Sequence, residues 1–110
     1  MDKIIENVLI KELNIAPSTS GFYLLKTAIK LGLEGDETFR KNMYEHIQKL
    51  HNKSYYAVVG GIRRAISVAE LADGELINKI LVKGDILSTI FLLTEEIKER
   101  IRGVKENGQN

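Results

Sequence analysis

The sequence contains no cysteine, a single proline and no apolar run long enough to cross a membrane. The absence of cysteine excludes disulfides, a thiolate nucleophile and the usual ligands of structural zinc. A transmembrane helix needs about 20 consecutive apolar residues, and a secretory signal would be basic where this chain carries Asp2 and Glu6. We therefore predict a protein of the reducing cytoplasm, with no membrane anchor and no cofactor.

Residue patterns that carry enzyme chemistry are also missing. The sequence offers no arrangement of nucleophile, base and orienting group. His46 and His51 are five residues apart, whereas a spacing of four would place two metal ligands on one helical face. The hydroxyl residues at 18–20 lack the glycines of a phosphate-binding loop, so we expect them to cap a helix. We predict neither enzyme activity, nor a metal site, nor a small-molecule substrate.

The chain has 110 residues, of which 44% are hydrophobic, and this suits one globular domain with a single core. Apolar residues recur at helical spacing almost everywhere, and sustained alternation typical of strands does not occur. We predict an all-α fold, a single six-helix domain over residues 1–110 that contains a helix-turn-helix. The helices are expected at residues 2–13, 20–31, 37–50, 55–72, 75–82 and 85–104. Residues 105–110 are expected to form a frayed tail.

Each of the longer helices carries an apolar stripe that we expect to face the core. The stripes are Ile5, Val8, Leu9 and Leu13; Phe22, Leu25, Ala28 and Ile29; Phe39, Met43, Ile47 and Leu50; Val58, Ile62, Ala65, Ile66 and Ala69; and Ile86, Ile90, Leu93, Ile97, Ile101 and Val104.

The net charge of +1 hides an uneven distribution along the chain. Residues 40–64 hold six basic side chains and one acidic side chain, a local charge of +5. Residues 1–39 hold four bases and six acids, and residues 65–110 hold six bases and eight acids, so each flank sums to −2. The positive charge is therefore concentrated in the third and fourth predicted helices.

These two helices are joined by a short turn at residues 52–54. In DNA-binding proteins the second helix of such a pair lies in the major groove, while the first crosses the backbone. Arginine suits guanine edges because its planar fork matches two acceptors, so Arg63 and Arg64 are the predicted base contacts. Lys49, Lys53 and Ser54 are predicted to contact phosphates.

Two further pairs in this region have both a functional and a structural interpretation. Tyr55 and Tyr56 would contact sugar or phosphate at the groove edge, or they would form a half-buried lid on the core. Ala57 and Gly60 would let the helix backbone lie close to the bases of DNA. Glycine inside a helix costs about 1 kcal/mol relative to alanine, so the pair Gly60 and Gly61 needs an explanation. The alternative to DNA contact is close packing against a neighbouring helix, or a bend.

Residues 10–101 resemble a known family. The matching stretches are IKELNI at 10–15, GFYLLKTAI at 21–29, YEHIQK at 44–49 and IRRAISVA at 62–69, followed by Gly74 and Gly84. They resemble the C-terminal effector domain of the master response regulator of endospore formation, the stage zero sporulation protein A family. The resemblance implies six helices, with a recognition helix at residues 55–72. It also implies binding to a short asymmetric DNA operator, often as tandem dimers, and control of genes for entry into sporulation.

The sequence departs from this family on the groove-facing side of the recognition helix. Ala57, Val59 and Gly60 stand where the family carries charged residues, and Arg64 replaces a histidine, while Arg63 matches. Two hypotheses follow. The chain is a DNA-binding transcriptional regulator whose partner is double-stranded DNA, or it is an interaction module that forms a homodimer or pairs with a full-length regulator through an apolar helix face.

Overall fold

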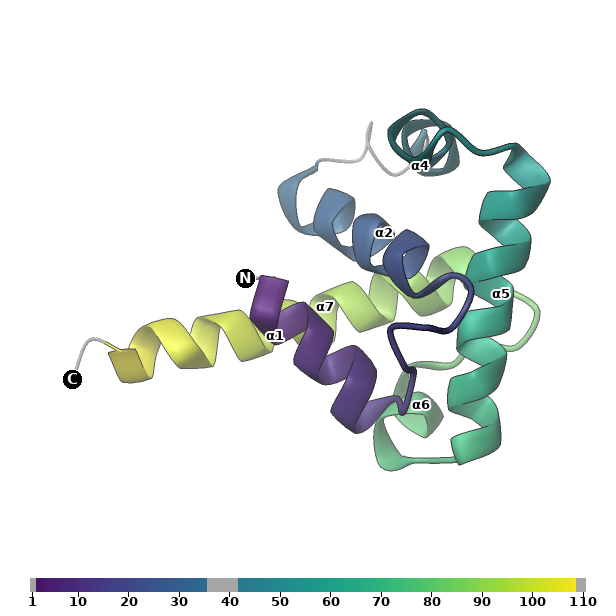
Figure 1. The fold of residues 1–110 in the computed structure, drawn as a ribbon. Helices are drawn as coiled ribbons and strands as arrows, with labels where there is room; N and C mark the ends of the chain where they lie inside the picture. Colours follow the sequence, from purple (N-terminus) through teal and green to yellow (C-terminus); the bar gives the residue numbers. More distant parts are fainter. Residues whose placement is uncertain (1, 36–41, 109–110) are drawn as a thin grey trace.

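The apolar periodicity of the sequence is realised as helices. A computed structural model of the chain describes residues 2–35 and 42–108, with side chains described up to Val104. In these residues the regular elements are all helical, so the predicted all-α class and the count of six α-helices are confirmed. They are α1 (Asp2–Asn7), continued by the π-helical segment η1 (Val8–Glu12), then α2 (Phe22–Glu34), α4 (Met43–His51), α5 (Tyr55–Ala72), α6 (Glu75–Ile80) and α7 (Ile86–Gly108) (Figure 1).

Several helix ends differ from the predicted ranges. The predicted start of the third helix, residues 37–41 with Phe39, lies outside the described residues, and α4 begins at Met43. α6 ends at Ile80 instead of residue 82, because the amide of Val82 donates to Thr89 Oγ1 of α7 at 2.9 Å. The predicted tail at 105–110 is wrong for residues 105–108, which complete α7.

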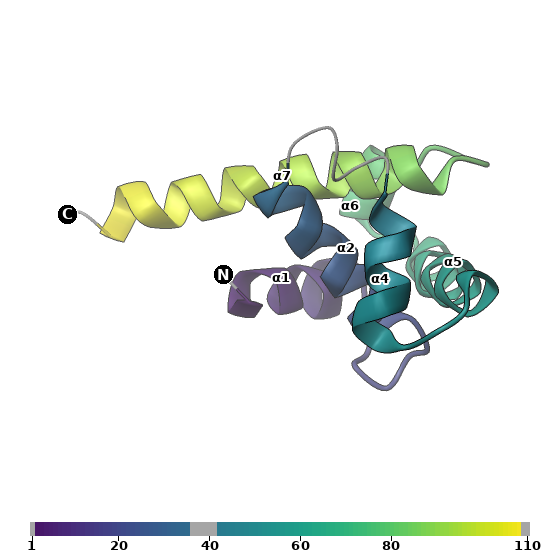
Figure 2. The same ribbon diagram turned by 90° about the horizontal axis from the view of Figure 1, so that it is seen from above.

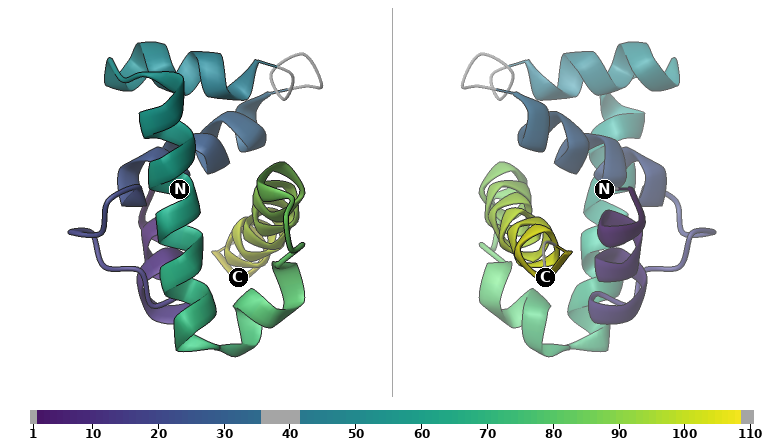
Figure 3. Two further views of the ribbon diagram at one scale, coloured as in Figure 1. Left: turned by 90° about the vertical axis from the view of Figure 1, so that its right-hand side faces the viewer. Right: turned by 90° about the vertical axis from the view of Figure 1, so that its left-hand side faces the viewer.

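The helices pack around α2. The helix α5 contacts α2 and α4, and α7 also packs on α2. Figure 3 shows α4 lying across one end of α5, so that the two helices cross steeply. The C-terminal part of α7 extends beyond the other helices in two perpendicular views (Figures 1 and 2). Val104 lies in this extension and is 57% exposed, so its predicted place in the core is wrong.

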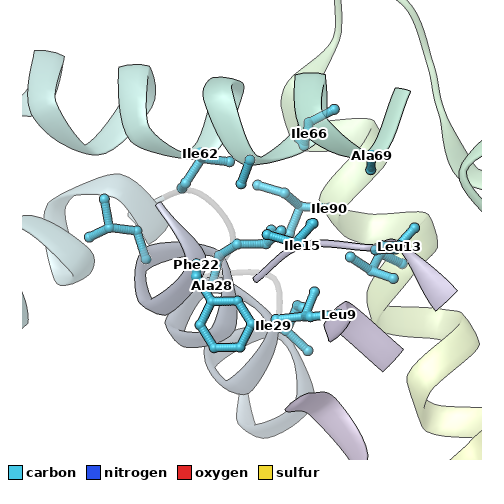
Figure 4. Close-up of a cluster of buried hydrophobic side chains, with 14 of the residues drawn as sticks. Leu9, Leu13, Ile15, Phe22, Ala28, Ile29, Ile62, Ile66, Ala69 and Ile90 are labelled. Carbon is cyan, nitrogen blue, oxygen red and sulfur yellow. The ribbon is translucent and has the colours of Figure 1, made fainter. Parts of the chain in front are cut away.

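The core forms where α2, α5 and α7 meet the segment that follows η1 (Figure 4). The apolar stripe predicted for α5 is buried in full, as is the stripe predicted for α2. Leu50 of α4 was predicted to face the core as well, and this is wrong, because its side chain is 68% exposed. One turn after Ile47, the helix turns His51 toward α2, where its Nε2 lies 2.7 Å from Thr27 Oγ1. Leu50 then faces away from the core.

The start of α2 is set by two glycines, not by the hydroxyl cap that the sequence predicts. Its N-cap is Gly21, which has a φ of 94° and no side-chain hydrogen bond to the helix. A Cβ at Gly21 would lie 1.8 Å from the carbonyl oxygen of Gly61 in α5. A Cβ at Gly61 would lie 2.7 Å from Leu24 and 3.3 Å from the Cα of Gly21. The backbones of α2 and α5 therefore touch at this point, which confirms close packing as the role of Gly61.

Ion pairs join the other helices. Glu12 accepts a two-pronged hydrogen bond from the Arg100 guanidinium, one prong of 2.8 Å, and Arg100 also lies 3.5 Å from Glu96. Glu96 in turn pairs with Lys79, so that η1, α6 and α7 share one charge network. The Arg100 hydrogen bond lowers the pKa of the Glu12 carboxyl below its ordinary value of 4.5.

Replacing Gly21 by alanine tests the contact between α2 and α5. We expect Gly21→Ala to lower the free energy of unfolding by about 3 kcal/mol, because the added methyl collides with backbone and the positive φ disfavours L-residues. The matched control is Gly60→Ala, since a Cβ there meets nothing within 4 Å, and it should raise stability by about 1 kcal/mol. Urea unfolding measures both, and equal effects of the two substitutions would refute the close contact.

The Glu12–Arg100 pair gives a pH-dependent contribution to stability. Because the pKa of folded Glu12 is lowered, the stabilisation is present above about pH 4.5 and is lost as pH falls through the folded value. Both side chains are more than a third exposed, so we expect Glu12→Gln to cost only about 0.5–1 kcal/mol at pH 7, and less at pH 3. Urea unfolding at the two pH values checks this, and a cost that grows toward pH 3 would contradict it.

Candidate nucleic-acid interface

Three residues suffice to turn the chain from α4 into α5. Asn52 adopts the left-handed conformation with a φ of 52°, and the amide of Lys53 donates to the Gln48 carbonyl at 3.0 Å. Ser54 then caps α5, with its Oγ accepting from the amide of Ala57 at 3.1 Å. The Ser54 hydroxyl hydrogen is not used in this bond, and it stays available to an external acceptor. The turn at residues 52–54 is thus fixed by local hydrogen bonds.

The outward side of α5 carries both predicted base-contacting arginines. Val58, Ile62 and Ala65 are buried on the inner side of the helix, and Arg63 and Arg64 are exposed. Successive residues of an α-helix point about 100° apart, so the two arginines leave the helix on different flanks. Gly60 lies between them on the outward side, where an added Cβ would meet nothing within 4 Å. The two glycines of α5 thus differ, since Gly61 is packed and Gly60 is open.

A hollow on the Arg64 flank of α5 collects most of the predicted interface. It has a volume of about 480 Å³ and lies between α5, the turn after α4 and the segment that leads into α2. We call it the Arg64 hollow. Its lining holds the bases His51, Lys53 and Arg64, and no acidic residue is among the described residues that line it. Its other lining residues are Thr19, Ser20, Gly21, Tyr23, Leu24, Tyr56, Ala57, Gly60 and Gly61.

Arg63 faces a second hollow, of about 320 Å³, between α5 and the turn that joins α6 to α7. Here the charges are mixed, because Lys83 is accompanied by the acids Glu70 and Asp85. The sequence places Arg63 and Arg64 side by side, but the structure divides them between a basic and a mixed surface. The positive potential of α5 is therefore stronger on the Arg64 flank.

The two tyrosines at the start of α5, Tyr55 and Tyr56, differ in exposure and in the residues that they contact. Tyr56 is 85% exposed and lines the Arg64 hollow, so the core-lid interpretation is wrong for it. Tyr55 packs edge-on against Tyr44 of α4, with ring centroids 5.7 Å apart, and against Tyr56 at 5.6 Å. Burial raises the pKa of the Tyr44 phenol above its ordinary value. Tyr55 is thus half-covered by α4, while Tyr56 points outward.

The cations of α5 differ from most other cations of the described residues in whether a carboxylate lies close to them. Lys26 and Lys30 of α2, Lys79 of α6, and Lys98, Arg100 and Arg102 of α7 lie within 4.0 Å of carboxylates. Lys53, Arg63 and Arg64 have no carboxylate that close among residues 2–35 and 42–104, and the same holds for Lys3, Lys11 and Lys83. Lys49 pairs with Glu45 at 3.8 Å and stays 76% exposed. The turn at 52–54 and α5 thus present positive charge with which no carboxylate of the described residues pairs.

One residue of this surface, Ser20, is not indicated by any pattern in the sequence. The Arg64 guanidinium donates to Ser20 Oγ at 2.9 Å, across 44 residues of sequence. Helical periodicity is a property of each helix by itself, so it does not show that the segment before α2 lies beside α5. Ser20 was expected to cap α2, and it instead holds an arginine.

The described residues show neither a metal centre nor a membrane-spanning segment. No three histidine, cysteine or carboxylate side chains in them gather as a metal ion requires. None of the described helices is both long and apolar enough to cross a bilayer. Comparison with models of protein families, with curated proteins and with solved structures returned no match.

Substitutions at Ser54 separate its structural role from contact with a ligand. Ser54→Ala removes the acceptor for the Ala57 amide, and we expect it to lower the free energy of unfolding by about 1 kcal/mol. Ser54→Asp keeps an acceptor and adds a favourable negative charge at the helix start, so it should retain the wild-type stability. Thermal unfolding compares them, and equal losses in both variants would rule out the cap.

Proposed function

We propose that this chain is a double-stranded-DNA-binding transcriptional regulator that inserts the outward side of α5 into the major groove. The observation that carries the proposal is the positive charge of the turn and α5, which has no described carboxylate within 4.0 Å, next to a hollow lined by bases and, among described residues, by no acid. Elsewhere in the described chain, carboxylates neutralise most cations. The net charge of the chain is only +1, so a surface with a local excess of positive charge favours binding to a polyanion such as DNA.

The shape of the surface supports the same partner. The steep crossing of α4 and α5 would let α5 lie in a groove while α4 crosses the DNA backbone (Figure 3). Gly60 has no side chain and Ala57 has only a methyl group, so the backbone of α5 would approach base edges closely on its outward side. Arg63 and Arg64 would contact bases from the two flanks, and Lys53 and Ser54 would bind phosphates.

The proposed biological role is control of transcription in the manner of the sporulation regulator that the sequence resembles. With the neutral residues Ala57, Val59 and Gly60 on α5, most of the affinity would come from phosphate contacts, and sequence preference would rest on the two arginines. We therefore expect graded preference among DNA sequences, with each disfavoured base pair costing about 1–3 kcal/mol.

Binding to a labelled duplex of randomised sequence tests the proposal. Neutralising a phosphate contributes about −0.9 to the slope of log K against log salt concentration, so the phosphate contacts predicted for Lys49 and Lys53 together give a slope of about −1.8. Arg63→Glu with Arg64→Glu should abolish binding, and Ser54→Asp should weaken it without loss of stability. Fluorescence anisotropy at several salt concentrations measures each affinity.

The matched control is Lys3→Glu with Arg102→Glu, which changes the net charge equally. These residues lie near the start of α1 and in the extension of α7, away from α5 (Figures 1 and 2). This control should retain binding to the randomised duplex. Full affinity in the α5 double variant would refute the proposal. A tight dimer in sedimentation that binds no duplex at low salt would favour the interaction module.

A further inference from the structure

The Arg64 hollow has a feature that general attraction to DNA does not explain, namely an arginine held in place by a serine from another part of the chain. Arg64 extends from α5 and donates to Ser20 Oγ at 2.9 Å. The segment that carries Ser20 is itself fixed, because the Thr19 amide donates to the Ala16 carbonyl at 2.9 Å and the Phe22 amide donates to the Thr19 carbonyl at 3.0 Å. Arg64 thus has a defined position although its side chain is exposed.

The remaining donors of Arg64 determine which ligand chemistry fits. A guanidinium has five N–H donors, and the bond to Ser20 uses one of them. Lys53 and His51 line the same hollow from the turn after α4, and the described lining holds no acid. Two cationic side chains, Arg64 and Lys53, that converge on one hollow suit an oxyanion, and the planar arginine fork matches two oxygens of a phosphate.

The hollow also opens toward the outward side of α5. Tyr56, Ala57 and Gly60 belong both to its lining and to the side of α5 proposed to enter the groove. The exposed rings of Tyr23 and Tyr56 line it as well, and they offer apolar surface to a sugar. A phosphate bound here would thus belong to the strand beside α5.

We propose that the Arg64 hollow binds one backbone phosphate of the duplex, with Arg64 as the direct ligand and Ser20 as its positioning residue. This inference rests on the proposed function, DNA binding by the turn and α5, and revises one part of it: Arg64 chiefly binds the backbone, in place of the base contact given to it above. The bound phosphate would fix how far α5 slides along the groove, so Arg63 would be left as the main reader of bases.

A double-mutant cycle on the duplex of randomised sequence tests this inference. Arg64→Gln should weaken binding about 10- to 100-fold and reduce the salt slope by about 0.9. Ser20→Ala should weaken binding about 5-fold in the wild-type background and have no effect in the Arg64→Gln background, because Ser20 acts through Arg64. The control Ser67→Ala, an exposed serine on the other flank of α5, should leave the affinity unchanged.

The outcomes separate this inference from the function on which it rests. If the wild-type protein binds no duplex at low salt, both fail. If it binds, but Arg64→Gln keeps the wild-type salt slope, or Ser20→Ala weakens binding equally in both backgrounds, the phosphate site fails alone. Selection of bound duplexes from a random pool adds a second readout. Arg63→Gln should broaden the selected sequences, whereas Arg64→Gln should leave them unchanged and weaken all of them equally.

Discussion

The contact between the backbones of Gly21 and Gly61 is the constraint on which the rest of the structure depends. It requires no side chain at either position, and it requires a positive φ at Gly21, which begins α2. Because α2 starts there, its apolar stripe packs between α5 and α7. The same contact brings the segment before α2 alongside α5, so that Ser20 reaches Arg64. One close approach therefore organises both the core and the candidate interface.

The arrangement of charges differs between the helix contacts and the candidate interface. Where helices meet at their polar edges, cations and carboxylates pair, as in the network of Glu12, Arg100, Glu96 and Lys79. Such partly exposed pairs add little stability each, but they neutralise those surfaces. The turn and α5 are built differently, with Lys53, Arg63 and Arg64 lacking close carboxylates among the described residues. The local excess in the sequence thus becomes a localised surface charge.

Helical class, helix count and most buried positions could be predicted from the sequence, because an amphipathic stripe is a local signal. Helical periodicity allows either Leu50 or His51, three and four residues after Ile47, to face the core. The prediction chose Leu50, whereas in the structure His51 faces inward and bonds to Thr27. They also missed contacts between distant segments, such as Ser20 with Arg64 and Gly21 with Gly61. The charge count located the basic part of the chain, but the division of Arg63 and Arg64 between two hollows follows from the packing of other segments against α5, which the count does not contain.

The central claim is that DNA meets the turn and the outward side of α5. Amide chemical shifts recorded while a short duplex is added at low salt would locate the contact residue by residue. The account predicts the largest changes at residues 19–21, 52–57, 60, 63 and 64, with small changes in α1 and in the extension of α7. Changes centred on α1 or α7, or none at any duplex concentration, would contradict it.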